Sequence, residues 1–157
     1  KSDQEDDGSW FGRWGTNYIY GTWSVLTALE IAEEDPQQGY IRKAVEYLQN
    51  MQNEDGGWGE SNDSYYPPRH YRPYQSTAFQ TAWALLSLLA VDEAESETVR
   101  RGINYLISNQ SSDGHWYDDS YTAPGFPRVF YLKYHGYTKY FPLWALARYR
   151  NILSNKS

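Results

Sequence analysis

Hydrophobic residues recur along this chain in two kinds of helical pattern. In residues 41–52 and 98–110, apolar side chains fall on one helical face and charged or amide side chains fall on the other. The apolar faces consist of Ile41, Ala44, Val45 and Leu48 in the first segment, and of Val99, Ile103, Leu106 and Ile107 in the second. A one-sided stripe of this width is typical of a helix with one face in solvent. The pattern predicts two outer helices.

Three other segments, residues 17–33, 75–91 and 138–151, carry apolar side chains over most of the helix surface. The clearest is 75–91, where Trp83 lies in a run of alanine, leucine and phenylalanine. A helix that lacks a polar face is expected inside a protein. The sequence therefore predicts three inner helices, which alternate along the chain with the outer ones.

One short motif, Gln-x-x-Asp-Gly-x-Trp, occurs three times with the same internal spacing. Its repeated positions are Gln4, Gly8 and Trp10, then Gln52, Gly56 and Trp58, then Gln110, Gly114 and Trp116. A motif used three times is typical of repeat architecture. We interpret it as a clamp, in which glycine ends an outer helix in the left-handed conformation, glutamine bonds the backbone of the neighbouring outer helix, and tryptophan stacks on that amide.

The order of segments predicts an all-α fold, an incomplete α/α toroid with inner and outer helices joined by these motif turns. Three inner helices and two outer ones are too few to close a ring. We therefore interpret residues 1–157 as the C-terminal part of one α/α barrel domain, with the rest of that barrel and any second domain outside this sequence.

Composition narrows the possible chemistry. The net charge is −6 and the pI is about 5.0, so the sequence lacks the basic surface of a nucleic-acid-binding protein. Cysteine is absent, and His70, His115 and His135 do not show metal-ligand spacing, so no metal site is expected. The nearly apolar run 82–91 is about half of the ~20 residues that a membrane-spanning helix needs. A soluble or membrane-peripheral protein is expected.

Aromatic residues make up 18% of the chain and are dense in two segments outside the repeats, 9–23 and 125–137. On an extended path, Phe126, Phe130 and Tyr134 would lie on one face. Aromatic faces attract cations, with about 0.5–2 kcal/mol for each ring. The composition alone leaves two interpretations open, a cavity that stabilises carbocations and an aromatic core.

Three stretches resemble the triterpene cyclases, and bacterial squalene–hopene cyclases in particular. These stretches are 8–23 (GSWFGRWGTNYIYGTW), 80–86 (QTAWALL) and 124–137 (PGFPRVFYLKYHGY), and the triple motif is similar to the QW motif of that family. The likeness covers nearly all of the chain and is weakest at 61–75. Phe79 departs from the family pattern, in which a small residue is usual at this position.

The resemblance implies an isomerase that protonates squalene and guides a carbocation cascade to hopene-type pentacycles, without metal or organic cofactor. It implies two α/α barrel domains and peripheral, monotopic attachment to the cytoplasmic face of a bacterial membrane. It also implies that certain side chains of this sequence line the substrate cavity, with Phe126 and Phe130 near later cations, Tyr134 and Tyr137 near earlier ones, and Leu132 shaping the space. The complete set of implied cavity residues is Trp14, Tyr20, Phe126, Phe130, Leu132, Tyr134 and Tyr137.

The family's proton donor, the middle acid of an Asp-x-Asp-Asp motif, has no counterpart here, since Glu5-Asp6-Asp7 and Tyr117-Asp118-Asp119 do not match it. We therefore assign no catalytic residue, and we expect the isolated chain to be inactive. The expected partners are squalene or a related polyprenoid, the remaining domain of the same enzyme, and a membrane surface.

Two alternatives remain. A non-catalytic α/α-toroid module could bind an apolar ligand or a protein, and its full-length gene would also lack the acid motif. Another toroid enzyme is the second alternative, but a protein prenyltransferase needs a cysteine-containing zinc site. A polysaccharide-degrading barrel would need a carboxylate pair on an inner helix, and none is present.

Overall fold

A computed structural model describes residues 1–67 and 74–155 of the chain, and these contain five α-helices, a 3₁₀ turn and a two-stranded sheet. The inner helices are α1 (Tyr18–Ile31), α3 (Ala78–Leu89) and α5 (Tyr137–Asn155). The outer helices are α2 (Gly39–Asn50) and α4 (Glu97–Ser108). The 3₁₀ turn η1 spans Asn62–Tyr65, and the strands are β1 (Ala123–Phe126) and β2 (Phe130–Leu132).

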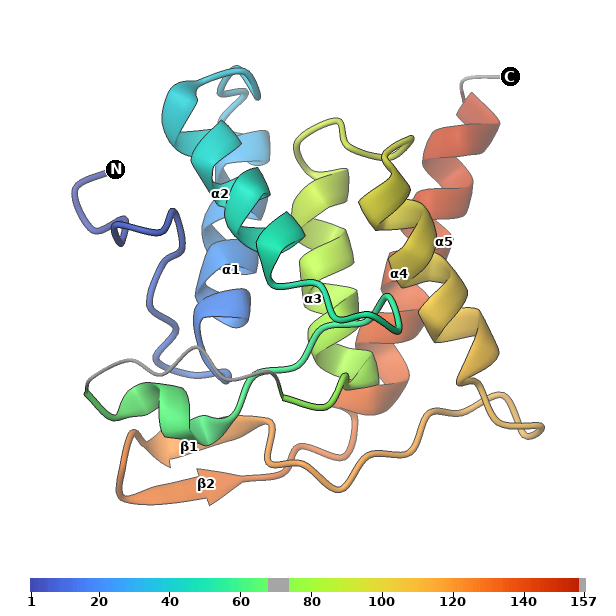
Figure 1. The fold of residues 1–157 in the computed structure, drawn as a ribbon. Coiled ribbons are helices and arrows are strands. Elements are labelled where there is room, and N and C mark those ends of the chain that lie inside the picture. Colours follow the sequence, from blue (N-terminus) through green and yellow to red (C-terminus); the bar gives the residue numbers. More distant parts are fainter. Residues whose placement is uncertain (68–73, 156–157) are drawn as a thin grey trace.

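The helices form two layers, with α1, α3 and α5 side by side and α2 and α4 across them (Figure 1). The inner helices all begin at the same end of the molecule, where η1 and the β1–β2 hairpin lie, and the outer helices run in the opposite direction (Figure 1). This alternation confirms the α/α-toroid arrangement predicted from the order of segments. The hairpin was not predicted.

The burial of the three inner helices differs. All twelve residues of α3 are buried, as its all-round apolar pattern predicts. Helix α1 and helix α5 are only partly covered, and Ile31, Leu143 and Trp144 are exposed. The reason is geometric, because α3 lies between the other two, whereas each flanking helix has a described inner neighbour on one side only.

The outer helices follow the predicted one-sided pattern with one exception. In α2 the predicted apolar residues are all buried, and in α4 so are Val99, Ile103 and Leu106. Ile107 is 58% exposed, so its assignment to the buried face was wrong. Gly102 is the buried residue of α4 that the pattern did not include. It packs so closely that an added Cβ would lie 2.7 Å from the Trp58 ring and 2.9 Å from the Leu85 side chain.

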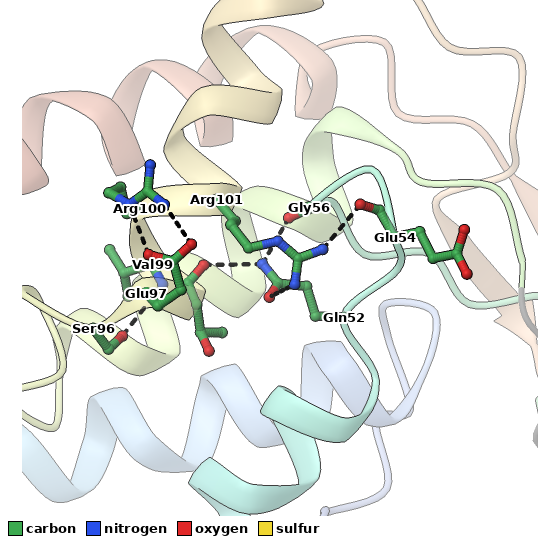
Figure 2. Close-up of polar contacts among 9 residues, drawn as sticks. Gln52, Glu54, Gly56, Ser96, Glu97, Val99, Arg100 and Arg101 are labelled. Atoms are coloured by element: carbon green, nitrogen blue, oxygen red, sulfur yellow. Dashed lines mark hydrogen bonds and ion pairs between the residues drawn. The ribbon is translucent and has the colours of Figure 1, made fainter.

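The glutamine side chain of the motif joins successive outer helices as predicted. The Gln52 amide donates to the carbonyl oxygen of Gly56 at 2.8 Å and to that of Thr98, the second residue of α4, at 2.9 Å (Figure 2). Gln4 makes the same pair of bonds, with Gly8 and with Tyr40, the second residue of α2. Among the described residues, Gln110 has the bond to its own turn only.

The clamp around Gln52 is reinforced from α4. Arg101 donates to the Gln52 side-chain oxygen at 3.3 Å and to the Glu54 carbonyl oxygen at 2.9 Å (Figure 2). It also donates to the Asn53 carbonyl oxygen at 2.9 Å. Because these contacts cross from one outer helix to the turn after the previous one, they tie neighbouring repeats together.

The glycine of the motif has a different role from the one predicted. Gly8, Gly56 and Gly114 all have positive φ, between 82° and 96°. However, α2 ends at Asn50, six positions before Gly56, so the glycine does not cap that helix. It lies in a tight turn, in which its N–H donates to the Asn53 carbonyl and Asp55 accepts from the next N–H. The left-handed conformation is therefore required by the turn.

The indole of the motif bonds the preceding outer helix. Trp58 Nε1 donates to the Leu48 carbonyl oxygen, and Trp116 Nε1 donates to that of Leu106, each at 2.8 Å. These acceptors belong to the last turn of an α-helix, whose carbonyl groups have no partner within the helix. The predicted stacking of tryptophan on the glutamine amide stays a prediction.

Replacing Gln52 with glutamate is expected to lower the free energy of unfolding by about 2 kcal/mol. The substitution removes both N–H donors and places carboxylate oxygens against two carbonyl oxygens. Thermal or denaturant unfolding measures the loss, and Gln4→Glu should give a similar one. Gln49→Glu, on the exposed side of α2, is the control and should change stability by less than about 0.5 kcal/mol. Equal effects at Gln52 and Gln49 would contradict the clamp.

Candidate functional site

A cluster of aromatic rings lies between the inner helices, with Trp83 of α3 at its centre. The Trp83 side chain is fully buried. Rings from α1, α3 and α5 surround it at centroid distances of 5.1–6.2 Å, and these are Tyr20, Trp23, Phe79, Tyr137 and Phe141. The Trp23 and Trp83 planes are within 10° of parallel, and the other four contacts are edge-to-face. Both arrangements are favourable for ring quadrupoles.

Three of the predicted cavity residues meet at this cluster. Tyr20 and Tyr137 both contact Trp83, at 5.1 Å and 5.8 Å, and Tyr134 lies 5.0 Å from Tyr137. Burial raises the pKa of Tyr20 and of Tyr137 above the usual value, so both phenols are neutral at physiological pH. The cluster therefore presents aromatic faces and neutral hydroxyl groups, but no phenolate nucleophile.

Phe126 and Phe130 form a separate pair on the hairpin. They face each other across the β1–β2 register, with ring centroids 5.8 Å apart, and both are about half exposed. The expectation of one extended path through Phe126, Phe130 and Tyr134 was wrong, because the chain reverses between the strands. Arg128, with a φ of 68°, makes this reversal possible. The two rings come together across strands and not along one strand.

The remaining predicted residues lie at the edges of this region. Leu132 ends β2, pairs with Ala123 and is 36% exposed. Trp14 is 59% exposed, and the Arg13 guanidinium lies 5.2 Å from its ring. Within the described residues, no ring contact connects Trp14 to the Trp83 cluster. Its place in a shared cavity stays a prediction.

Several other rings in this region were predicted to lie on the inner helices but were not assigned to the cavity. They are Trp23, Phe79, Trp83, Phe141 and Trp144. Their signal was spacing, since aromatic residues three or four positions apart share a helical face. The indole nitrogens of Trp23 and Trp83 are buried and have no hydrogen-bond partner, which marks their surroundings as apolar. Phe79, the departure from the family pattern, packs at 5.1 Å against Trp83.

A groove of about 730 Å³ lies elsewhere, at the second motif turn. It is lined by residues 50–55, by Gly59 and by residues 74–76. None of the predicted cavity residues belongs to its lining. The groove and the aromatic cluster are therefore distinct features.

Metal clusters and membrane-spanning helices are both absent from the described part of the chain. Among residues 1–67 and 74–155, no three histidine, aspartate or glutamate side chains gather closely enough to hold a metal ion. His70 lies outside the described residues. Across the same ranges, none of the helices has the length and hydropathy needed to cross a bilayer.

Comparison with known proteins identifies the family. The family described as squalene-hopene cyclase C-terminal domain matches residues 1–151. A squalene–hopene cyclase of Zymomonas mobilis is 63% identical over 96% of this chain and 23% of its own length. The one of Alicyclobacillus acidocaldarius is 47% identical over 99% of this chain and 25% of its length. A dammaradiene synthase of Dryopteris crassirhizoma is 43% identical over 98% of the chain and 24% of its length.

The chain thus spans about a quarter of the length of the relatives it matches. The match includes all three motif copies, both aromatic segments and most of α5. On this agreement of sequence and architecture, the chain belongs to the squalene–hopene cyclase C-terminal domain family.

Proposed function

We propose that this chain is the C-terminal part of a triterpene cyclase that converts squalene into hopene-type pentacycles by a carbocation cascade. The observation that carries the proposal is the aromatic cluster centred on Trp83, in a member of this family. Squalene is an apolar chain without charged groups, so its recognition depends on shape and apolar contact. The cluster offers apolar aromatic surface for such contact.

Aromatic rings suit the intermediates of such a cascade. Each face can stabilise a nearby cation by about 0.5–2 kcal/mol, more when water is excluded. Rings cannot trap the cation as a carboxylate or a free hydroxide would. The role of this part of the protein is then to stabilise charge that develops on carbon and to keep water away until the last ring closes.

We assign the cavity lining to Trp14, Tyr20, Phe126, Phe130, Leu132, Tyr134 and Tyr137 within that proposal. The Phe126–Phe130 pair on the hairpin would act on later cations, while Tyr134 and Tyr137, at the cluster, would act on earlier ones. Leu132, at the end of β2, would limit the space beside them.

The proton that starts the cascade must come from outside residues 1–157, because the Asp-x-Asp-Asp motif is absent from them. The remaining domain of the enzyme would therefore supply the acid, complete the barrel and make contact with the membrane. We place the full-length protein on the cytoplasmic face of a bacterial membrane, as a peripheral protein. A proton-initiated isomerisation requires neither a metal nor an organic cofactor.

The test compares the full-length protein with the 157-residue chain, each incubated with squalene in detergent. Gas chromatography with mass spectrometry should show pentacyclic products for the full-length protein and unreacted squalene for the chain alone. Pentacycles made by the chain alone would contradict the assignment of the acid to the rest of the protein. A full-length protein that binds squalene without converting it would instead indicate a binding module.

A further inference from the structure

The segment 60–65 lies outside the triple motif. It forms hydrogen bonds with the loop that contains Trp14 and with the N-terminal end of α1, which contains Tyr20. The carboxylate of Glu60 is buried and accepts three backbone N–H groups, those of Asn17, Tyr18 and Ile19, at 3.1 Å each. These are the first N–H groups of α1, which have no partner within a helix. The Asn17 side chain makes no cap of its own, so Glu60 caps α1 from a distant part of the chain.

Glu60 is itself fixed by α3. The side-chain oxygen of Gln80 accepts the Glu60 N–H at 3.0 Å, and its amide nitrogen donates to the Glu60 carbonyl oxygen at 3.0 Å. The same nitrogen donates to the Thr16 carbonyl oxygen at 3.1 Å. One buried amide on α3 therefore connects the capping residue to the loop before α1.

Tyr65 completes the attachment at the other end of the segment. Its hydroxyl oxygen lies 2.7 Å from the Gly12 carbonyl oxygen and 2.8 Å from that of Gly15, and its single hydrogen can serve one of them at a time. These two glycines flank Trp14 on the same loop. Burial, with a smaller contribution from the Glu60 charge, raises the Tyr65 pKa far above its usual value, so the hydroxyl remains a donor.

Two further contacts strengthen the same connection. The Thr16 hydroxyl donates to the Asn62 side-chain oxygen at 2.6 Å, and the Asn17 amide donates to the Ser64 hydroxyl at 3.2 Å. Hydrogen bonds therefore join residues 60–65 to residues 12–19 from one end of the segment to the other, and each of these bonds involves at least one side chain.

We propose that Glu60 and Tyr65 are positioning residues for the cyclisation, and that they set the placement of Tyr20 and Trp14 against the substrate. Tyr20 is the third residue of α1, one position after the last N–H that Glu60 accepts. A change at Glu60 would therefore move the start of α1, and a change at Tyr65 would move the Trp14 loop. The inference rests on the proposed cyclase function.

The experiment uses the full-length enzyme with Glu60→Gln and Tyr65→Phe, assayed with squalene for kcat, KM and the ratio of products. Misplaced reacting geometry should lower kcat on the order of 10-fold to 100-fold, with KM within about twofold. Both variants should also raise the fraction of incompletely cyclised products. In a Tyr20→Phe background, Glu60→Gln should have a smaller effect, because two changes that act through one side chain are not additive.

Two matched variants separate positioning from loss of stability. Ser96→Ala removes the cap of α4, where the hydroxyl accepts the Val99 N–H at 3.2 Å. Tyr105→Phe removes a partly buried hydroxyl that donates to the Ser76 carbonyl oxygen at 2.9 Å. Both should lower the midpoint of thermal unfolding and leave the product ratio unchanged, since neither contacts residues 12–19.

Each result decides the inference. An active wild type whose Glu60→Gln and Tyr65→Phe variants keep the normal kcat and product ratio overturns the positioning role alone. If Glu60→Gln fails to fold, Tyr65→Phe, which loses one oxygen atom, decides by itself. A wild-type enzyme that leaves squalene unreacted overturns the proposed function, and this inference with it.

Discussion

Replacing Trp83 with alanine is expected to lower the free energy of unfolding by about 4 kcal/mol, the largest loss of any substitution considered. The side chain is fully buried, and truncating a buried tryptophan leaves a large cavity. The substitution also removes five ring contacts, four of which join α3 to α1 or α5. Because α3 lies between the other inner helices, Trp83 contributes to the packing of all three.

Denaturant unfolding of the full-length protein, followed by circular dichroism, would measure this loss. Trp83→Phe keeps an aromatic ring at the centre of the cluster and should recover roughly half of the stability. Glu46→Ala, on the exposed side of α2, should change it by less than about 0.5 kcal/mol. A Trp83→Ala protein as stable as the Glu46→Ala control would refute the central role of Trp83.

Replacing Gly21 with alanine is expected to destabilise the protein by about 3 kcal/mol, although alanine is the better helix former. In the interior of an isolated helix the change would be favourable by about 1 kcal/mol. Here a Cβ at Gly21 would lie 2.1 Å from the Trp10 carbonyl oxygen and 2.7 Å from the Phe11 carbonyl carbon. Either α1 or the backbone of residues 10–12 must move to make room for the methyl group. The cost of this overpacking outweighs the gain in helix propensity.

Gly39 provides the matched control, because it is also a helical glycine, but a Cβ added there would meet no atom of a neighbouring segment within 4 Å. Gly39→Ala should leave stability unchanged or raise it by up to about 1 kcal/mol. The same unfolding experiment is therefore expected to show a loss of stability for Gly21→Ala and no loss for Gly39→Ala. A Gly21→Ala protein that is as stable as the wild type, or more stable, would show that propensity, and not contact with residues 10 and 11, controls α1.

Much of the helical architecture was predictable from the sequence, because it depends on local periodicity and on repetition. The outer-helix stripe identified Ile41 and Val99 as buried, and the equal spacing of the motif copies predicted the bonds from Gln4 and Gln52 to the next outer helix. The exposure of Ile107 was not predictable in this way, because helical periodicity defines a face but not its width.

The features that were missed depend on contacts between distant segments. No local signal shows that Glu60 caps a helix more than 40 positions earlier in the chain. The hairpin was missed because its strands have only four and three residues, and Arg128 adopts a conformation more usual for glycine. The resemblance implied that Tyr20 and Tyr137 line one cavity, but the ring that connects them, Trp83, became evident only in three dimensions.

The shared direction of the inner helices has an electrostatic consequence for the proposed chemistry. Each helix carries about half a positive charge at its N-terminus, and α1, α3 and α5 all begin at the end where the hairpin lies (Figure 1). A carbocation beside Phe126 and Phe130 would therefore experience a repulsive potential from these helix ends. The Glu60 carboxylate accepts the first N–H groups of α1, and its negative charge reduces the positive potential at this one of the three helix ends.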